Sequence, residues 1–530
     1  MNDSLDPKRL LLGKRLSTRH LEGELLPKTI ALPIFSSDPL SSVAYGPQEM
    51  LMILTLGGVG MLAFAPWIAA VVVLLLTFIV LSYRKVVAAY PSGGGDYEVA
   101  KKNIGEKSAL VVASALLLDY VMTVAVSIAS GVDNLISAFP EINTWRVEMA
   151  VGFILLLCAI NLRGVRESGV AFAVPTYIFI ASVMLMLGMG VYKLMTGQAI
   201  QAVSANLQIQ ADKTLTSTGL LFALLLLRSF ASGSAALTGV EAIANGVPAF
   251  RLPKVKNAQI TMTWMGITAI TMLVGIVSFA LISGVRYVED ASQLLGSQQA
   301  DFLANPQKSV IAQLGLAIFG DGSVMFFVLQ AATAAILLLA ANTAFNGFPL
   351  LSSVLAKDGY APKALLTRGD RLVYSNGMLS LTLAAGVLEL IYQANVSALI
   401  QLYVLGVFTS FTVGQIGMLR HWKTGKANGT ITPNEAFSGT FVNGIGATLT
   451  ASVLVIVTIT KFTHGAWLVF IIMPVLYFVM YNTKRYYSTV EAEIAIDETT
   501  AFGSEGDYAV VLMDKLNKPQ LKALDYAIST

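Results

Sequence analysis

Long apolar segments recur along the whole chain, and they constrain its fold more than any other feature of the sequence. About twelve of them are long enough to cross a bilayer as a helix, which takes roughly 20 residues. Hydrophobic residues make up 55% of the 530 and charged residues only 13%, a composition that excludes a soluble enzyme. The net charge of +3 is too small to suggest a nucleic-acid partner. We therefore expect an all-α polytopic membrane protein. The expected spans are 30–56, 62–88, 108–138, 145–162, 169–195, 217–248, 258–284, 309–346, 376–394, 398–420, 441–462 and 465–488.

Three parts follow from this pattern. Residues 1–29 form a polar N-terminal segment, residues 30–490 the transmembrane domain, and residues 491–530 a tail in which charges become more frequent. In the tail, Tyr508–Asp514 reads as a buried strand and Pro519–Ile528 as a short helix. One strand and one helix cannot build a core. We therefore expect the start of a cytoplasmic α/β domain that is truncated at the end of this sequence.

The basic residues predict the orientation. With the N-terminus in the cytoplasm, most of the 35 lysines and arginines fall on the cytoplasmic side, as the positive-inside rule requires. Both termini are then cytoplasmic. The outside receives only Arg146, Lys193, Lys213, Arg286, Lys308 and Lys461. Arg228 lies inside the sixth span, where we expect it to pair with a carboxylate, because it would repel a bound cation.

The first span carries the polar stretch Ser36–Gly46, with four serines, Asp38 and Pro39. Pro39 cannot donate a backbone hydrogen bond, and it disfavours the helical conformation at the residue before it. An aspartate at mid-membrane costs about 2.5–3.5 kcal/mol on insertion scales. These features predict a helix that is broken at the membrane midplane, with backbone carbonyls and a carboxylate facing a cavity. The alternative is a simple proline kink in which neighbouring hydroxyls satisfy Asp38.

The sixth span repeats this pattern. Ser229–Gly246 contains glycines and hydroxyls that interrupt a helix, and Glu241 adds a second intramembrane acid. Interrupted helices at positions one and six imply two units of five helices each. Because five is odd, the second unit enters the membrane from the opposite face, which gives a 5+5 inverted repeat of the kind found in secondary transporters. The last two helices lie outside the repeat.

The third span places an acid and two hydroxyls on one helical face. Asp119, Thr123 and Ser127 are four residues apart, an arrangement suited to a dehydrated hard cation, which requires several oxygen ligands. A stripe of serine and threonine can also serve helix packing alone. Tyr45 and Tyr403, with Tyr120, could supply further oxygens or a gate.

The loop Pro91–Tyr97 is rich in glycine but lacks the Lys-Ser/Thr pair of a phosphate-binding P-loop. It follows a membrane span, and we interpret it as a tight cytoplasmic turn that could contribute to an inner gate.

Several motifs together resemble the KimA family of bacterial potassium importers, which belongs to the amino acid–polyamine–organocation superfamily and has the leucine-transporter-like fold. The motifs are Ser36–Gly46, Tyr90–Tyr97, Leu118–Tyr120, Leu237–Ala242, Ala341–Thr343, Arg368–Leu372 and Leu402–Gly406. The resemblance covers nearly the whole chain. It implies potassium uptake coupled to protons at the cell membrane, a homodimer, no cofactor, and a C-terminal cytosolic domain that regulates transport, with a possible regulatory nucleotide.

The resemblance also assigns site residues. The positions that match the ion pathway of the family are Asp38, Tyr45, Asp119, Tyr120, Thr123, Ser127, Thr238, Glu241 and Tyr403. The acids among them, Asp38, Asp119 and Glu241, are the candidates for proton coupling. No catalytic residue is implied.

Two other functions are compatible with the sequence. One is a proton-coupled permease for amino acids or cationic amines, whose positive group could bind Asp119 or Glu241. The other is a membrane sensor, although two broken helices are unnecessary for sensing alone. Amino-acid carriers of the superfamily usually have a glycine-rich break in the first helix, where backbone N–H groups bind the substrate carboxylate. Here no glycine occurs before Gly46, and Asp38 would repel that carboxylate, so a cation fits better.

Overall fold

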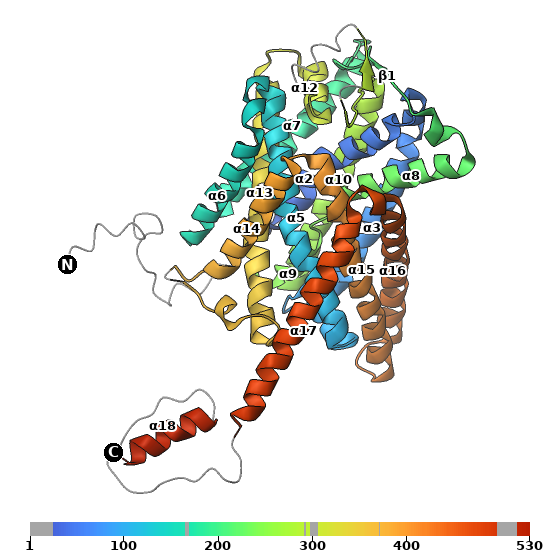
Figure 1. The fold of residues 1–530 in the computed structure, drawn as a ribbon. Coiled ribbons are helices and arrows are strands. Elements are labelled where there is room, and N and C mark those ends of the chain that lie inside the picture. Colours follow the sequence, from blue (N-terminus) through green and yellow to red (C-terminus); the bar gives the residue numbers. More distant parts are fainter. Residues whose placement is uncertain are drawn as a thin grey trace, which may run out of the picture.

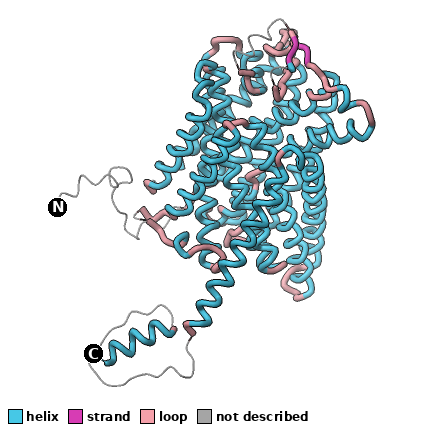
Figure 2. The backbone as a smooth tube through the Cα atoms, in the orientation of Figure 1, coloured by secondary structure: helices cyan, strands magenta, loops and turns pink. Residues whose placement is uncertain are grey.

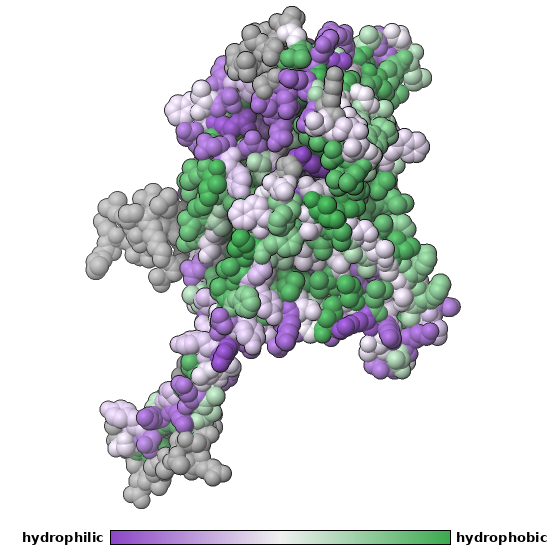
Figure 3. Space-filling model, turned by 45° about the vertical axis from the view of Figure 1, so that its right-hand side comes forward, coloured by the Kyte–Doolittle hydropathy of each residue, from purple (hydrophilic) through white to green (hydrophobic). Residues whose placement is uncertain are grey.

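Long helices build almost the whole molecule (Figures 1 and 2). The computed structural model describes residues 25–164, 169–290, 293–296, 306–369, 371–495 and 517–529. In this part of the chain, 11 helices are long and apolar enough to cross a membrane. The helix α2 (Lys28–Thr55) also has the length, and its serines, prolines and acids make it more polar than the others. Together they give the twelve spans expected, and apolar side chains form a belt between hydrophilic ends (Figure 3).

The two units of five helices are visible in the packing. The first unit contains α2, α3 (Ala65–Ala89), α5 (Glu106–Ala138), α6 (Arg146–Leu162) and α7 (Gly169–Met195). The second contains α8 (Gly219–Gly233) with α9 (Glu241–Asn245), then α10 (Lys254–Ile282), α13 (Val324–Lys357), α14 (Ser375–Tyr392) and α15 (Val396–Ala427). In four cases a helix packs on its counterpart five spans later: α2 on α8, α3 on α10, α5 on α13 and α6 on α14. Such pairing is what a two-fold relation between the units produces.

The remaining helices flank this core. α16 (Pro433–Lys461) packs along α15, and α17 (Val469–Glu493) packs on α5. The short α4 (Gly95–Asn103) lies against α5 and α15. At the other end of the bundle, α12 (Val310–Phe319) packs on α13, and β1 (Gln208–Ile209) pairs antiparallel with β2 (Leu294–Leu295) (Figure 1).

The predicted break of the first span is wrong in its backbone. α2 is helical from Lys28 to Thr55, with Pro33, Pro39 and Pro47 inside it. Pro39 removes only its own N–H from the helical ladder. The hydroxyls of Ser41 and Ser42 donate to the Asp38 carbonyl over 2.9 and 3.0 Å, which adds local hydrogen bonds just after the proline. The helix therefore continues through the polar stretch.

The predicted break of the sixth span is confirmed. α8 ends at Gly233, the 3₁₀ turn η5 covers Ser234–Leu237, and α9 begins only at Glu241. Between them Thr238 has extended backbone angles and Gly239 has a φ of +78°. Two consecutive non-helical residues interrupt the ladder of backbone hydrogen bonds and leave polar groups free to bind a ligand.

The eighth expected span, 309–346, is also wrong in its limits. It consists of two helices, α12 and α13, and α13 continues to Lys357. The turn between them contains Gly320 and Gly322, with φ values of 92° and 68°. Glycine populates this left-handed region without steric cost, so these residues end one helix and allow the next to start in a new direction.

Two further expectations from the sequence concern the tail and Lys461. α18 (Lys518–Ser529) confirms the expected helix near 519–528, whereas the expected strand at 508–514 lies outside the described residues. Lys461, which the charge pattern assigns to the outer surface, is 0% exposed at the end of α16. Its side chain points into the bundle and not into solvent.

Candidate functional site

The break of the sixth span faces α2 at Asp38. A Cβ at Gly239 would lie 2.4 Å from the Asp38 Oδ2 atom, and one at Gly46 would lie 2.6 Å from the Cβ of Ala236. Both distances are far below van der Waals contact, so glycine is required for this approach of the two segments. The Asp38 carboxylate therefore lies directly against the non-helical residues that join η5 to α9.

Hydroxyl groups bridge the same two segments. Ser42 Oγ lies 2.8 Å from Tyr45 Oη and 3.0 Å from Thr238 Oγ1. All three residues are at most 1% exposed. Ser42 and Tyr45 are three residues apart on α2 and thus share a face, while Thr238 is the extended residue of the break. The result is a buried cluster of hydroxyls beside Asp38.

The predicted polar face of α5 lies in the core of the bundle. Asp119, Thr123 and Ser127 are 3%, 2% and 1% exposed. Thr123 Oγ1 lies 3.1 Å from the hydroxyl of Tyr403 on α15. A Cβ at Gly406 would lie 3.2 Å from the Ala115 carbonyl, so this glycine allows α15 to approach α5 next to Tyr403. The stripe therefore faces α15 across a narrow, oxygen-lined contact.

Tyr120 occupies the edge of this arrangement. It is partly buried, and its ring packs against Gly347 of α13. Its phenol is close enough to interact electrostatically with Asp38, Asp119 and Glu241. Tyr120 thus borders the acids, but no hydrogen bond connects it to the hydroxyl cluster in the described part of the chain.

Three carboxylates meet around the break. Asp38, Asp119 and Glu241 are 6%, 3% and 4% exposed, and the charge of Asp119 interacts with those of the other two. Within the described residues, one oxygen of each has no hydrogen-bond partner, namely Asp38 Oδ1, Asp119 Oδ1 and Glu241 Oε2. A buried carboxylate oxygen without a partner is costly, and a proton or a bound cation removes that cost. The site can therefore exchange protons and cations.

The donor set restricts the ligand. Carboxylates, hydroxyls and phenols are hard oxygen donors, which suit alkali and alkaline-earth cations rather than soft metals. Among the described residues, no three His, Cys, Asp or Glu side chains come together as a metal site.

Comparisons with known proteins agree with this geometry. A profile of the amino acid permease family matches residues 34–481. The potassium transporter KimA of Bacillus subtilis is 37% identical over 524 residues, which are 98% of this chain and 81% of KimA. The chain belongs to the amino acid permease family and, within it, to the KimA family. The low-affinity putrescine importer PlaP of Escherichia coli K12 is 26% identical over 141 residues, 27% of this chain and 31% of PlaP. Both relatives are transport proteins.

In this KimA-family chain, the nine residues named from the sequence lie on four elements: α2, α5, the break with α9, and α15. Direct contacts connect Ser42 of α2 with Thr238, and Thr123 with Tyr403. Asp119, Tyr120 and Glu241 join them through electrostatic interactions. Ser127 lies two turns from Asp119 on the same face, and its hydroxyl has no partner in the described part of the molecule.

Sequence reasoning missed two buried residues. Ser42 was noted only as one of four serines, although it is the hydroxyl that joins Tyr45 to Thr238. Asp96 was placed in a cytoplasmic turn, and it is only 1% exposed. Its Oδ2 atom accepts hydrogen bonds from Tyr83 Oη at 2.6 Å and Ser410 Oγ at 2.9 Å. The helical spacing from Asp38 to Ser42 was a signal for the first.

No pattern in the sequence indicated Asp96. Gly93, Gly94 and Gly95 have φ values of 79°, 99° and 47°, and this run of left-handed residues turns α4 under the bundle. A Cβ at Gly95 would lie 2.2 Å from the side-chain oxygen of Asn245 at the end of α9. The three glycines therefore place Asp96 beside the segment that carries Glu241, with which its charge interacts.

Proposed function

We propose that this protein is a secondary active transporter that imports potassium together with protons. The observation that carries this proposal is the oxygen-lined contact between α2, the broken sixth span, α5 and α15, with three buried carboxylates that each have one oxygen without a partner in the described residues. The 37% identity to a potassium transporter supports potassium as the cation. Protons are supported by the chemistry of the carboxylates, since buried acids bind protons in competition with a cation.

The proposal includes the surroundings of the transporter. We place it in the cell membrane with both termini in the cytoplasm, because the lysines and arginines then follow the positive-inside rule. We further propose a homodimer and a regulatory cytoplasmic domain that starts near residue 491, with a nucleotide as its possible ligand. These last points rest on the resemblance to the KimA family.

A cationic amine is the second candidate substrate. The partial similarity to a putrescine importer favours it, and a carboxylate cluster would bind an ammonium group. An amino acid is less suited to the site, because the Asp38 carboxylate lies at the break, where a substrate carboxylate would have to bind.

Rubidium uptake into proteoliposomes, with and without an inward proton gradient, tests the proposal. We expect saturable uptake that potassium inhibits and that the proton gradient accelerates. Putrescine and a mixture of amino acids serve as competitors and should leave the uptake unchanged. Accumulation of labelled putrescine, or of an amino acid, that an uncoupler abolishes would instead identify a permease. Rubidium uptake that does not respond to the proton gradient would identify a uniporter.

A further inference from the structure

A polar stripe continues along α2 beyond the proposed ion site. Asp38, Ser42, Tyr45 and Glu49 are separated by four, three and four residues, so all four lie on one helical face. Asp38 is 6% exposed and Glu49 is 0% exposed. The two acids are eleven positions apart, which at a rise of 1.5 Å per residue is about 16 Å. Such a face connects one end of the bundle with the proposed ion site.

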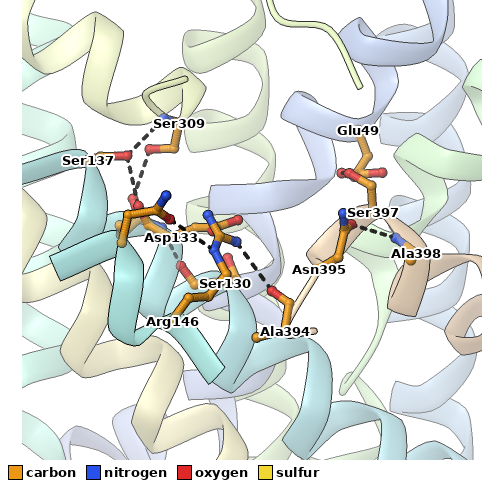
Figure 4. Close-up of polar contacts among 12 residues, drawn as sticks. Glu49, Ser130, Asp133, Ser137, Arg146, Ser309, Ala394, Asn395, Ser397 and Ala398 are labelled. Carbon is orange, nitrogen blue, oxygen red and sulfur yellow. Dashed lines mark hydrogen bonds and ion pairs between the residues drawn. The ribbon is translucent and has the colours of Figure 1, made fainter. Parts of the chain in front are cut away.

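Glu49 lies toward the end of the bundle that carries α12. Its neighbour Gln48 accepts a hydrogen bond from the backbone N–H of Val310, the first residue of α12, over 3.0 Å. Ser397 Oγ at the start of α15 donates to Glu49 Oε1 over 2.8 Å, and Figure 4 shows these two side chains beside each other. The other oxygen, Oε2, has no partner among the described residues. Glu49 thus resembles the three acids of the ion site in its burial and in its free oxygen.

Two cations on other helices, the buried Lys461 and the partly buried Arg228, interact with the charge of Glu49. Lys461 at the end of α16 is 0% exposed, and its Nζ atom makes no hydrogen bond within the described part of the chain. The charge of Glu49 acts on Lys461 through space, and Arg228 on α8 acts on it with the opposite sign. The charged or titratable groups that interact with Glu49 from the surrounding elements are Lys461, Arg228, Glu289, Asp133 and Tyr287.

This arrangement differs from a structural ion pair. Two buried charges stabilise a fold only when they meet in good geometry with their remaining hydrogen bonds satisfied. Here the free Oε2 atom of Glu49 and the free Nζ atom of Lys461 do not bond to each other within the described residues. Protonation of Glu49 would remove the negative charge that acts on Lys461 and Arg228, and so change how α2 is held against α8, on which α16 also packs.

We propose that Glu49 is a proton-binding residue of the transport cycle, which takes up the coupled proton from the outer side before it reaches Asp38. The proposal rests on the proton coupling and on the orientation proposed above. A proton from external water binds the Glu49 carboxylate. It is then passed along the same face by Tyr45 and Ser42, whose hydroxyls lie 2.8 Å apart and can each accept one proton and donate another, and it ends on the Asp38 carboxylate. Glu49 returns to its ionised form.

The test compares two modes of rubidium transport in proteoliposomes. Net uptake driven by a proton gradient requires proton binding and release, whereas exchange of internal potassium for external rubidium at equal pH does not. We expect Glu49→Gln to reduce proton-driven uptake by about tenfold or more, since proton transfer by a positioned acid usually contributes at least that much. Exchange should stay within about twofold of the wild-type rate. A purely structural role of Glu49 would reduce both modes alike, and that result would overturn the proposal.

Two further variants keep the test decisive. Ser397→Ala removes the hydrogen bond to Glu49 and keeps the acid. We expect it to move the external pH of half-maximal uptake to a more alkaline value, because the ionised carboxylate loses a donor. An unchanged pH response would contradict the proposal even if Glu49→Gln failed to fold. Glu389→Gln is the matched control: Glu389 on α14 is also 0% exposed with both oxygens unpartnered in the described residues, but it is not on the stripe. It should retain the coupled uptake of the wild type.

Uptake by the wild type distinguishes a failure of the proposed symport from a failure of the proposed role of Glu49. If wild-type uptake is independent of the proton gradient, the proposed symport fails. If the wild type is coupled and Glu49→Gln is equally coupled, only the role of Glu49 fails.

Discussion

At the scale of single residues, the chain concentrates its chemistry in buried acids. Asp38, Asp119 and Glu241 meet around one helix break, while Glu49 and Asp96 lie farther along the polar faces of α2 and α4. In an apolar bundle each of these carboxyl groups requires hydrogen bonds, a proton or a cation. Because one oxygen of each of Asp38, Asp119 and Glu241 has no partner in the described structure, changes in charge at these three positions should affect transport more than stability.

We expect Asp38→Asn and Asp119→Asn each to reduce rubidium uptake by roughly 10- to 100-fold, the effect of losing one charge-assisted contact to the ion. The amides keep the shape of the side chains, so insertion and folding should be preserved. Uptake into proteoliposomes measures the effect, and size-exclusion chromatography checks the fold. Asp321→Asn in the exposed turn before α13 is the control. Wild-type uptake in both acid variants would show that these residues are structural.

Asp96 gives a pH dependence of stability. It lies on α4, outside the spans, where burial raises its pKa from 3.8 to about 6 although Tyr83 and Ser410 donate hydrogen bonds that lower it. The folded protein therefore binds this proton more tightly than the unfolded chain does. Its contribution to stability is complete below about pH 4 and is lost as the pH rises through about 6.

Asp96→Asn should abolish this loss, because the amide does not ionise and its oxygen still accepts from both hydroxyls. Thermal unfolding in detergent measures it: relative to wild type, the variant should gain stability between about pH 4 and pH 7. Exposed Asp321→Asn should follow the wild type over the same range. A constant difference between Asp96→Asn and wild type at all pH values would rule out this assignment.

At the scale of elements, the first and sixth spans show what local sequence can and cannot predict. Glycines, hydroxyls and an acid correctly indicated the break between η5 and α9. The same kind of signal failed in α2, where serine hydroxyls bond to the Asp38 carbonyl and the helix continues past Pro39. Composition alone did not distinguish the two cases. Gly239 has a left-handed φ in the non-helical link before α9, whereas Pro39 inside α2 removes only its own N–H from the helical ladder.

The residues of the candidate site, like the helix breaks, were predictable from the sequence only in part. Spacing identified the face of Asp119, Thr123 and Ser127, and intramembrane charge identified Asp38 and Glu241. What spacing cannot show is contact between distant helices, such as Ser42 with Thr238. Asp96 was missed for the same reason, since its position depends on three consecutive glycines whose conformation the sequence leaves open.

Gly239→Ala tests the role of the break. Its φ of +78° is unfavourable for alanine, and the added Cβ would lie 2.4 Å from the Asp38 carboxylate. Left-handed backbone costs a non-glycine residue about 1–3 kcal/mol, and the carboxylate must also move. We expect strongly reduced rubidium uptake with modest loss of thermal stability. Gly188→Ala on α7, where a Cβ meets no atom within 4 Å, is the matched control and should transport normally. Equal transport by both variants would show that the approach of Asp38 to the break is dispensable.

At the scale of the whole molecule, transport requires that the two ends of the bundle open in turn. The described contacts include links at both ends. Arg146 pairs with Asp133 over 2.5 Å and donates to the Ala394 carbonyl near the start of α15 (Figure 4). At the other end, Lys101 of α4 pairs with Asp358 after α13 over 2.6 Å. The proposed ion site lies between these two layers, and we propose that each layer closes one access route while the other is open.

The last prediction concerns the driving force. The membrane potential supplies about 2.3 kcal/mol per charge per 100 mV, and a proton carried inward adds a second charge and the pH gradient. For a proton to drive potassium uptake, it must bind to the acid cluster from outside and leave to the inside. In a cluster of interacting carboxylates the proton belongs to the group rather than to one residue.

We therefore expect the rate of uptake to rise as external pH falls from about 8 to about 6 at clamped potential. Glu241→Gln removes one acid of the cluster and should flatten this dependence or stop transport, while Glu389→Gln should keep it. A rubidium flux that is independent of external pH in the wild type, with no accompanying proton influx, would mean that the carboxylates bind the cation without coupling it to protons.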